Sequence, residues 1–119
     1  MSFKQQCQEV FDHYVACYRK GDANGCASVF AAQAEMYSPF GPPSIGRQAI
    51  EDTHAEWVAE GGEDKKINVS SAGRDGELGW CLAEFSEGTT GEGVSLNVLE
   101  RQPDGRWLIT LCSLNETHP

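Results

Sequence analysis

His54 and Glu84 are the two titratable residues whose positions favour proton exchange with a bound molecule. His54 is spaced with Ile50 and Val58 on one face of a predicted helix, so its imidazole is expected to point inward as a general acid or base. Glu84 shares a strand face with Leu78 and other apolar residues, where a carboxylate has a raised pKa and can exchange protons. The alternatives are a core histidine bonded to the backbone and a solvated carboxylate near a strand end.

Two tyrosine hydroxyls are placed where they could polarise an oxygen atom of the same molecule. Tyr14 lies on the inward face of the first predicted helix, and Tyr37 lies beside a proline-rich loop. Tyr14 is equally compatible with a core position in which its hydroxyl is satisfied. The remaining candidate ligand-binding residues are aromatic side chains, which can also be core, and polar side chains on apolar strands, which can also cap strand ends: Phe40, Trp57, Trp80, Asn97, Ser113 and Asn115.

The histidines and cysteines do not have metal-binding spacings. His13, His54 and His118 belong to different predicted elements, and none is part of an H-x-x-x-H pattern. The cysteines are odd in number and widely spaced, which indicates neither a zinc site nor a disulfide framework. We therefore expect no metal and no other cofactor, and we interpret the cysteines as small buried hydrophobes: Cys7, Cys17, Cys26, Cys81 and Cys112.

The acidic composition restricts the classes of partner. The 119 residues include 18 acidic and 9 basic side chains, giving a net charge of −9, and the only adjacent basic pairs are Arg19-Lys20 and Lys65-Lys66. Nucleic acid and anionic membrane surfaces are therefore not expected as partners. The sequence also lacks a run of about 18 apolar residues and an apolar N-terminal signal. The expected location is the cytoplasm, and residues 1–119 are expected to form one domain.

Helical periodicity marks three segments in the first half of the chain. Apolar residues recur at helical spacing from Phe3 to Arg19, with Ser2 as N-cap and Gly21 as the stop. A shorter helix is expected over Gly25 to Phe30, and a third over Arg47 to Glu60. The sequence therefore predicts that three helices precede the sheet.

The segment between the second and third helices is expected to be mostly irregular. A brief strand is predicted near Glu35 to Tyr37. Because proline fixes φ and disfavours helix at the preceding residue, Phe40 to Ser44 is not expected to continue a regular element. This rigid, apolar loop is interpreted as the rim of a cavity.

From Lys65 onward apolar residues alternate with a period of two, which is typical of strands. A first strand leads to a hairpin turn at Gly73 to Gly76, and short links join the later strands. Helices followed by an antiparallel meander predict an α+β fold. The expected later strands are Leu78 to Ser86, Gly93 to Gln102 and Arg106 to Asn115.

Two of these strands are apolar on both faces. In one of them Leu78, Trp80 and Leu82 oppose Cys81 and Phe85. Since the helices can cover only one face of the sheet, the other face is expected to contact a second subunit. The sequence therefore predicts a homodimer formed through the sheet.

Several short motifs occur in an order that resembles a known superfamily. The first helix ends in Tyr-Arg-Lys-Gly-Asp, and Tyr37 begins the motif Tyr-Ser-Pro-Phe-Gly. The third helix opens with Ile-Gly-Arg-Gln-Ala-Ile. The last two strands are joined by Gln-Pro-Asp-Gly-Arg-Trp-Leu-Ile, which is followed by Leu114 and Asn115. From Val10 to Asn115 the chain resembles the nuclear transport factor two-like superfamily, particularly its ketosteroid isomerase-like and polyketide cyclase (SnoaL)-like members. The resemblance implies a cone-shaped cystatin-like fold, in which three N-terminal helices pack on a curved antiparallel sheet around an apolar pocket, commonly in a dimer.

The resemblance narrows the function without naming a reaction. Ser38 stands where ketosteroid isomerases carry their aspartate base, so steroid isomerisation is not expected, although Tyr14 matches the position of their oxyanion tyrosine. We expect a small dimeric protein that binds an apolar or aromatic molecule, with isomerase, cyclase, dehydratase or hydrolase chemistry that needs no cofactor. The alternative is a non-catalytic ligand-binding or assembly module whose cavity is filled by side chains.

Overall fold

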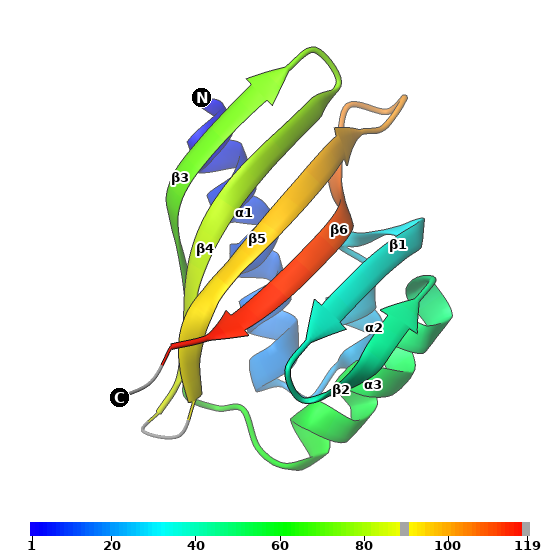
Figure 1. Cartoon of the computed structure of the whole chain (residues 1–119), viewed down its shortest axis with the longest axis vertical. Coiled ribbons are helices and arrows are strands. Elements are labelled where there is room, and N and C mark those ends of the chain that lie inside the picture. The colour runs from blue at the N-terminus through cyan, green and yellow to red at the C-terminus, as the bar shows by residue number, and fades with distance from the viewer. Residues whose placement is uncertain (89–90, 118–119) are drawn as a thin grey trace.

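The computed structural model describes residues 1–88 and 91–117, which contain three helices and six strands (Figure 1). In chain order they are α1 (Phe3–Arg19), α2 (Ala23–Ala27), β1 (Phe30–Ser38), β2 (Gly41–Ile45), α3 (Arg47–Ala59), β3 (Lys65–Asp75), β4 (Leu78–Glu87), β5 (Gly91–Arg101) and β6 (Trp107–Glu116). The strands form one sheet in the order β2-β1-β6-β5-β4-β3. Figure 1 shows α1 behind strands β3 to β6, with α3 beside β1 and β2. The predicted α+β class and the antiparallel meander from β3 to β6 are confirmed.

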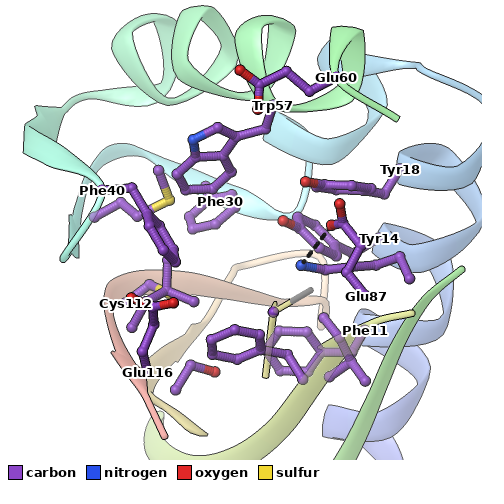
Figure 2. A pocket seen from close by; sticks show the side chains of 17 residues that line it. Phe11, Tyr14, Tyr18, Phe30, Phe40, Trp57, Glu60, Glu87, Cys112 and Glu116 are labelled. Atoms are coloured by element: carbon purple, nitrogen blue, oxygen red, sulfur yellow. Dashed lines mark ion pairs between the residues drawn. The ribbon is translucent and has the colours of Figure 1, made fainter. Parts of the chain in front are cut away.

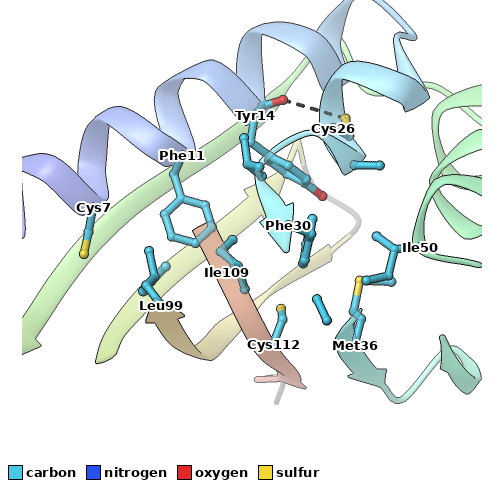
Figure 3. Close-up of a cluster of buried hydrophobic side chains, with 14 of the residues drawn as sticks. Cys7, Phe11, Tyr14, Cys26, Phe30, Met36, Ile50, Leu99, Ile109 and Cys112 are labelled. Atoms are coloured by element: carbon cyan, nitrogen blue, oxygen red, sulfur yellow. Dashed lines mark hydrogen bonds between the residues drawn. The ribbon is translucent and has the colours of Figure 1, made fainter. Parts of the chain in front are cut away.

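Helix α1 forms over the predicted residues because its two ends are capped and one of its faces is apolar. Ser2 and Gln5 make a reciprocal capping box at the N-terminus, and Gly21 has a φ of 75° just beyond the C-cap. The buried face repeats at helical spacing with Cys7, Phe11, Tyr14, Cys17 and Tyr18. Helix α1 thereby presents a continuous apolar and aromatic face to the sheet (Figure 3).

The structure corrects the prediction for the segment that follows. Helix α2 ends at Ala27 instead of reaching Phe30, and β1 is a full strand instead of a brief one. The reason is a pairing that is distant in sequence: Phe30 lies opposite Ile109 in a parallel ladder between β1 and β6. The sheet is therefore mixed, whereas the sequence predicted only antiparallel pairs.

The proline-rich segment is also more regular than predicted. Gly41 to Ile45 forms strand β2, which pairs with β1 through Met36↔Ser44 and Glu35↔Ile45. Two consecutive prolines are tolerated because β2 is an edge strand, where a missing N–H need not break a ladder. The expectation of an irregular loop over Phe40 to Ser44 is therefore wrong, and only the β1–β2 turn remains irregular.

The sheet has two apolar faces, as the sequence predicted, but with a definite inward set. Cys81, Ala83 and Phe85 of β4 are buried against the helices, whereas Leu78 and Trp80 are 52% and 42% exposed on the outer face. The first hairpin turn consists of Gly76 and Glu77, so β3 runs further than predicted, to Asp75. No helix among residues 1–88 and 91–117 is long and apolar enough to cross a membrane.

Candidate functional site

A cavity of about 300 Å³ lies between the last turns of α1, the C-terminal end of α3 and the inner face of the sheet (Figure 2). The spacing of its α1 residues, Phe11, Tyr14 and Tyr18, places all three on one side of that helix. Trp57 of α3 and Phe40 of the β1–β2 turn close the opposite wall, edge to face, with their ring centroids 6.1 Å apart. Phe40 and Trp57 therefore stand where the sequence placed them, at the cavity wall.

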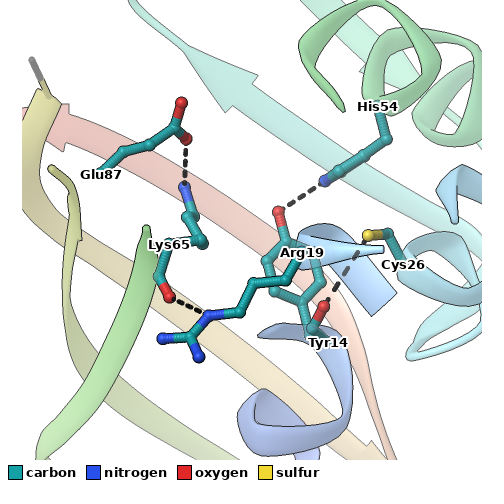
Figure 4. A network of polar contacts seen from close by, with 6 residues as sticks. All are labelled: Tyr14, Arg19, Cys26, His54, Lys65 and Glu87. Atoms are coloured by element: carbon teal, nitrogen blue, oxygen red, sulfur yellow. Dashed lines mark hydrogen bonds and ion pairs between the residues drawn. The ribbon is translucent and has the colours of Figure 1, made fainter. Parts of the chain in front are cut away.

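Charged side chains project into this aromatic enclosure. Lys65, at the start of β3, is 8% exposed, and its ammonium lies 3.8 Å from the Glu87 carboxylate. The same ammonium is 4.6 Å from the centroid of the Tyr18 ring and 5.2 Å from that of Phe85. Arg19 holds the backbone at this point by donating a hydrogen bond of 2.8 Å to the Lys65 carbonyl (Figure 4). Lys65 is thus held in an apolar enclosure by a carboxylate and two aromatic faces.

The surroundings of this ion pair shift the pKa values of Lys65 and Tyr18. Burial lowers the pKa of Lys65, and the charge of Glu87 opposes that effect. Burial raises the pKa of Tyr18 well above its ordinary value, and the charge and hydrogen bond of Glu87 raise it further. Lys65, Glu87 and Tyr18 therefore form one interacting group in the cavity wall.

His54 and Tyr14 meet behind the cavity wall. His54 is 0% exposed, and its Nε2 lies 2.7 Å from the Tyr14 hydroxyl, while its Nδ1 lies 2.8 Å from the Ile50 carbonyl oxygen. Burial lowers the pKa of His54 to about 4, partly offset by the Ile50 hydrogen bond, and the Lys65 charge lowers it further. Burial also raises the pKa of Tyr14 well above its ordinary value. The structure brings these two predicted residues together, but only Tyr14 lines the cavity.

Glu84 and Trp80 do not reach the site. Since Cys81, Ala83 and Phe85 point inward along β4, the alternate residues Trp80 and Glu84 point outward, where both are exposed. The predicted inward carboxylate at Glu84 is therefore wrong, and so is the placement of Trp80 in the pocket. Both strand faces are apolar, and the sequence alone had no signal to show which of them was the inner one.

The other polar candidates are also off the cavity. Tyr37 is exposed, and its hydroxyl donates to Glu35 at 2.7 Å. Ser113 and Asn115 lie on the outer side of β6, opposite Leu96 and Val94 of β5. Their predicted contact with a ligand in the pocket is not compatible with these positions.

Asn97 does point inward, but it is buried beneath the cavity instead of lining it. Its Nδ2 donates to Ser95 Oγ at 3.0 Å, and Ser95 lines the cavity, as does Gly91 of the same strand. The Oδ1 atom of Asn97 is buried without a hydrogen-bond partner among the described residues. Asn97 is therefore a core residue supporting the site from below.

Sequence reasoning missed Lys65, Tyr18 and Glu87 as site residues. Tyr18 was part of the apolar helical pattern of Phe3 to Arg19, and Lys65 was noted only as a member of an adjacent basic pair. A signal was present in the strand alternation, because Lys65 has the same parity as Ile67, which also lines the cavity. Glu87 likewise has the parity of Phe85 on β4. Lys65 is therefore the first inward-facing residue of β3, and Glu87 is the last inward-facing residue of β4.

The described residues contain no group of three or more His, Cys, Asp or Glu side chains that could hold a metal ion. His118, considered in the sequence analysis, lies outside the described residues. The five cysteines are buried and free, in the positions expected of small hydrophobes. The polar groups that line the cavity are the Lys65 ammonium, glutamate carboxylates, tyrosine hydroxyls, the Ser95 hydroxyl and the Cys112 thiol.

We expect His54 to make the protein less stable as the pH falls from about 6.5 to about 4. The folded-state pKa lies below the unfolded value, so the unfolded chain binds more protons in this window, and stability is fully present above it. The contribution lost is roughly 3 kcal/mol of unfolding free energy. The Tyr14 hydroxyl, the Tyr18 ring and the charge of Lys65 act on His54, and none of these is a negative charge that could offset the loss.

The measurement is urea unfolding between pH 4 and 7 for the parent chain, His54→Gln and the matched control His13→Gln. His13 is an exposed histidine of α1. His54→Gln is expected to flatten the profile relative to the parent, and His13→Gln to retain the parental slope. An unchanged slope in His54→Gln would show that His54 does not titrate differently on folding.

Comparisons with known proteins bear on the fold. No family model and no curated protein sequence matches this chain. Among solved structures, a ketosteroid isomerase-like protein from Erwinia carotovora atroseptica matches with a TM-score of 0.76 and 12% identity, over 94% of each chain. An NTF2-like protein with a cystatin-like fold from Novosphingobium aromaticivorans matches with a TM-score of 0.70 and 17% identity, over 92% of this chain and 79% of its own.

ActVI-ORFA from Streptomyces coelicolor also matches, with a TM-score of 0.72 and 14% identity over 100% of both chains. At these identities the likeness establishes architecture, whereas activity depends on residues that each protein carries in its own site. The predicted resemblance is thereby confirmed at the level of structure. The chain has the cystatin-like fold shared by nuclear transport factor two-like and ketosteroid isomerase-like proteins.

Proposed function

We propose that this protein binds a small, neutral aromatic molecule in the cavity, with an oxygen atom of that molecule directed at Lys65. The observation that carries the proposal is the ion pair of Lys65 and Glu87 inside an aromatic enclosure. Desolvated charge in an apolar pocket is costly, and it is typical of sites that recognise or transform a ligand. The rings of the ligand would pack against Phe11, Phe30 and Trp57.

The size and charge of the cavity define the class of ligand. A volume of about 300 Å³ is at the lower end of the range for small-molecule sites, which favours a compact molecule. Glu60, Glu87 and Glu116 set three carboxylates against the one ammonium of Lys65 in the lining. An organic anion would meet this excess of negative charge, so a neutral ligand with a carbonyl or hydroxyl group is favoured.

The open cavity argues against the alternative of a module whose cavity is filled by side chains. Phe11, Phe30 and Trp57 line the space without occupying it. Burial of His54 with a hydrogen bond to the backbone agrees with a structural role for that residue. Ligand binding therefore explains the open cavity, which a role in assembly alone does not explain.

A second candidate function is proton transfer at a carbon next to a carbonyl group. Glu87 and Lys65 form an acid–base pair in the cavity, with 3.8 Å between their charged atoms. The Glu87 carboxylate would take the proton from carbon, and the Lys65 ammonium would give a proton to the carbonyl oxygen, so that the ketone becomes an enol. Lys65 and Glu87 take the place of Glu84, which faces away, and of His54, which does not reach the cavity.

We also infer that a second copy of this chain covers the outer face of the sheet. Across β4, β5 and β6 two cross-strand rows there carry no charge: Trp80 is paired with Val98, which is paired with Leu111, and Leu82 is paired with Leu96. The first of these rows ends at Glu35 of β1, opposite Leu111. Because each copy carries a net charge of −9, two copies can approach only where the contact is free of carboxylates. A two-fold contact between identical uncharged rows meets that condition.

A bicyclic aromatic ketone, 2-tetralone, is expected to bind and to quench the fluorescence of Trp57. Removing the Trp57 indole should abolish the quenching, because this ring lines the cavity. The measurement is a fluorescence titration of the parent chain, Trp57→Phe and the matched control Trp80→Phe. Trp80 lies on the outer face, so its variant should keep the quenching. If 2-tetralone binds with equal affinity and equal quenching in all three proteins, the assigned cavity is wrong.

In deuterium oxide the protein is expected to accelerate exchange of deuterium into 2-tetralone next to its carbonyl group, as followed by mass spectrometry. Glu87→Gln should reduce the accelerated rate by about 10²-fold or more, since it removes the proposed base. Glu84→Gln is the matched control, because Glu84 is a carboxylate of the same strand on the opposite face. Equal loss in both variants, or no acceleration by the parent chain, would exclude the proposed acid–base pair.

Size-exclusion chromatography with light scattering is expected to give twice the mass of one chain at micromolar concentration. Trp80→Arg should shift the protein toward the monomer, because it places a charge in the uncharged rows. Ala55→Arg, at an exposed position of helix α3 away from the outer face of the sheet, is the control and should stay dimeric. A parent chain that elutes with the mass of one copy contradicts the proposed dimer.

A further inference from the structure

The proton on the imidazole of His54 can be located from its two hydrogen bonds. Nδ1 lies 2.8 Å from the carbonyl oxygen of Ile50, four residues earlier in α3. A carbonyl oxygen can only accept, so Nδ1 must carry the hydrogen. The opposite tautomer would set a ring lone pair against the carbonyl lone pairs at a site that is 0% exposed, with no water to replace the lost bond.

The second ring nitrogen is then an acceptor. His54 is surrounded by the rings of Tyr18, Phe30 and Trp57, an environment that favours the neutral imidazole. In the neutral ring with hydrogen on Nδ1, Nε2 carries only a lone pair. The 2.7 Å contact between Nε2 and the Tyr14 hydroxyl is therefore a hydrogen bond that Tyr14 donates.

The direction of this bond sets what Tyr14 offers to the cavity. Its single hydroxyl hydrogen is directed at His54, and the structure shows no other hydrogen bond to its oxygen among residues 1–88 and 91–117. Tyr14 lines the cavity together with Lys65 and Glu87. What remains available there is a lone pair, so Tyr14 can accept a hydrogen bond from a ligand but cannot donate one.

Lys65 has the opposite property. Its ammonium has three donors and no acceptor, and it projects into the same cavity. An O–H group of a ligand satisfies both residues, since its hydrogen bonds to the Tyr14 oxygen and its own oxygen accepts from Lys65. A carbonyl or ether oxygen can satisfy only Lys65 and offers no hydrogen to the remaining lone pair of the Tyr14 oxygen.

We propose that Tyr14, held by His54, is a specificity-determining acceptor that selects phenols and enols over ketones and ethers of the same shape. This inference rests on the proposed function, because it assumes that the cavity binds a ligand. The same preference would shift the proposed equilibrium between ketone and enol toward the enol. The enol formed from a ketone gains a hydrogen bond that the ketone lacks, which favours the enol within the site.

The test compares 2-naphthol with 2-methoxynaphthalene, which differ by the O–H hydrogen replaced by a methyl group. Dissociation constants are measured by fluorescence titration in the parent chain, in Tyr14→Phe and in Tyr37→Phe. The parent chain is expected to prefer 2-naphthol by about tenfold or more, equivalent to one hydrogen bond. Tyr14→Phe should lose that preference, and Tyr37→Phe should retain it, because Tyr37 is exposed outside the cavity.

A second measurement is independent of ligand and of any variant. Nitrogen-15 NMR of the parent chain at pH 7 reports which ring nitrogen of His54 carries the hydrogen, and Nδ1 is expected. Hydrogen on Nε2, or on both nitrogens, overturns the inference even if Tyr14→Phe fails to fold. Equal affinity for the two probes in the parent chain also overturns it while leaving the proposed binding function intact. Binding of neither probe overturns the proposed function, and the selectivity with it.

Discussion

The packing of α1 against the concave face of the sheet is the contact on which the rest of this structure depends. A curved sheet of six strands cannot bury its inner face by itself, and α1 supplies the apolar surface that covers it. Phe11, Tyr14 and Tyr18 belong to the buried core and also line the cavity. The cavity is therefore the part of the concave face that α1 borders but does not fill. Its position follows from where that helix ends, near Arg19.

Desolvation then decides what each polar group in this region can do. His54 is enclosed by aromatic rings, so it is neutral and serves to orient Tyr14 instead of exchanging protons with a ligand. Lys65 is buried as well, but it keeps a charged partner in Glu87 and two aromatic faces. These residues differ in their access to the cavity, because Lys65 and Glu87 line it and His54 does not. Lys65 and Glu87, unlike His54, are therefore placed to contact a ligand directly.

The sequence predicted the elements that depend on local pattern and missed those that depend on distant pairing. Helix α1 and the β3–β6 meander follow from spacing, caps and turn residues that are all near one another in the chain. The parallel pairing of β1 with β6 joins Phe30 to Ile109, and no local pattern encodes it. The same applies to β2, whose prolines are compatible with a strand only because it lies at the sheet edge. For the site, the inward helical residues were predicted correctly, whereas Trp80 and Glu84 were assigned to the wrong face because both faces of β4 are apolar.

Glu84 and Glu87 show why that ambiguity matters for function. They are three residues apart on one strand, so they project to opposite faces, and the choice of face decides which carboxylate lies beside Lys65 in the cavity. Tyr14 and His54 are different, because both are buried in the core. In the proposed site their hydrogen bond also determines that the Tyr14 oxygen acts as an acceptor. Substitutions there are expected to change stability and recognition together. The Lys65–Glu87 pair sits at strand ends beside the cavity, so its chemistry can be altered with less disturbance to the packing of α1, and this makes it the better place to separate binding from folding.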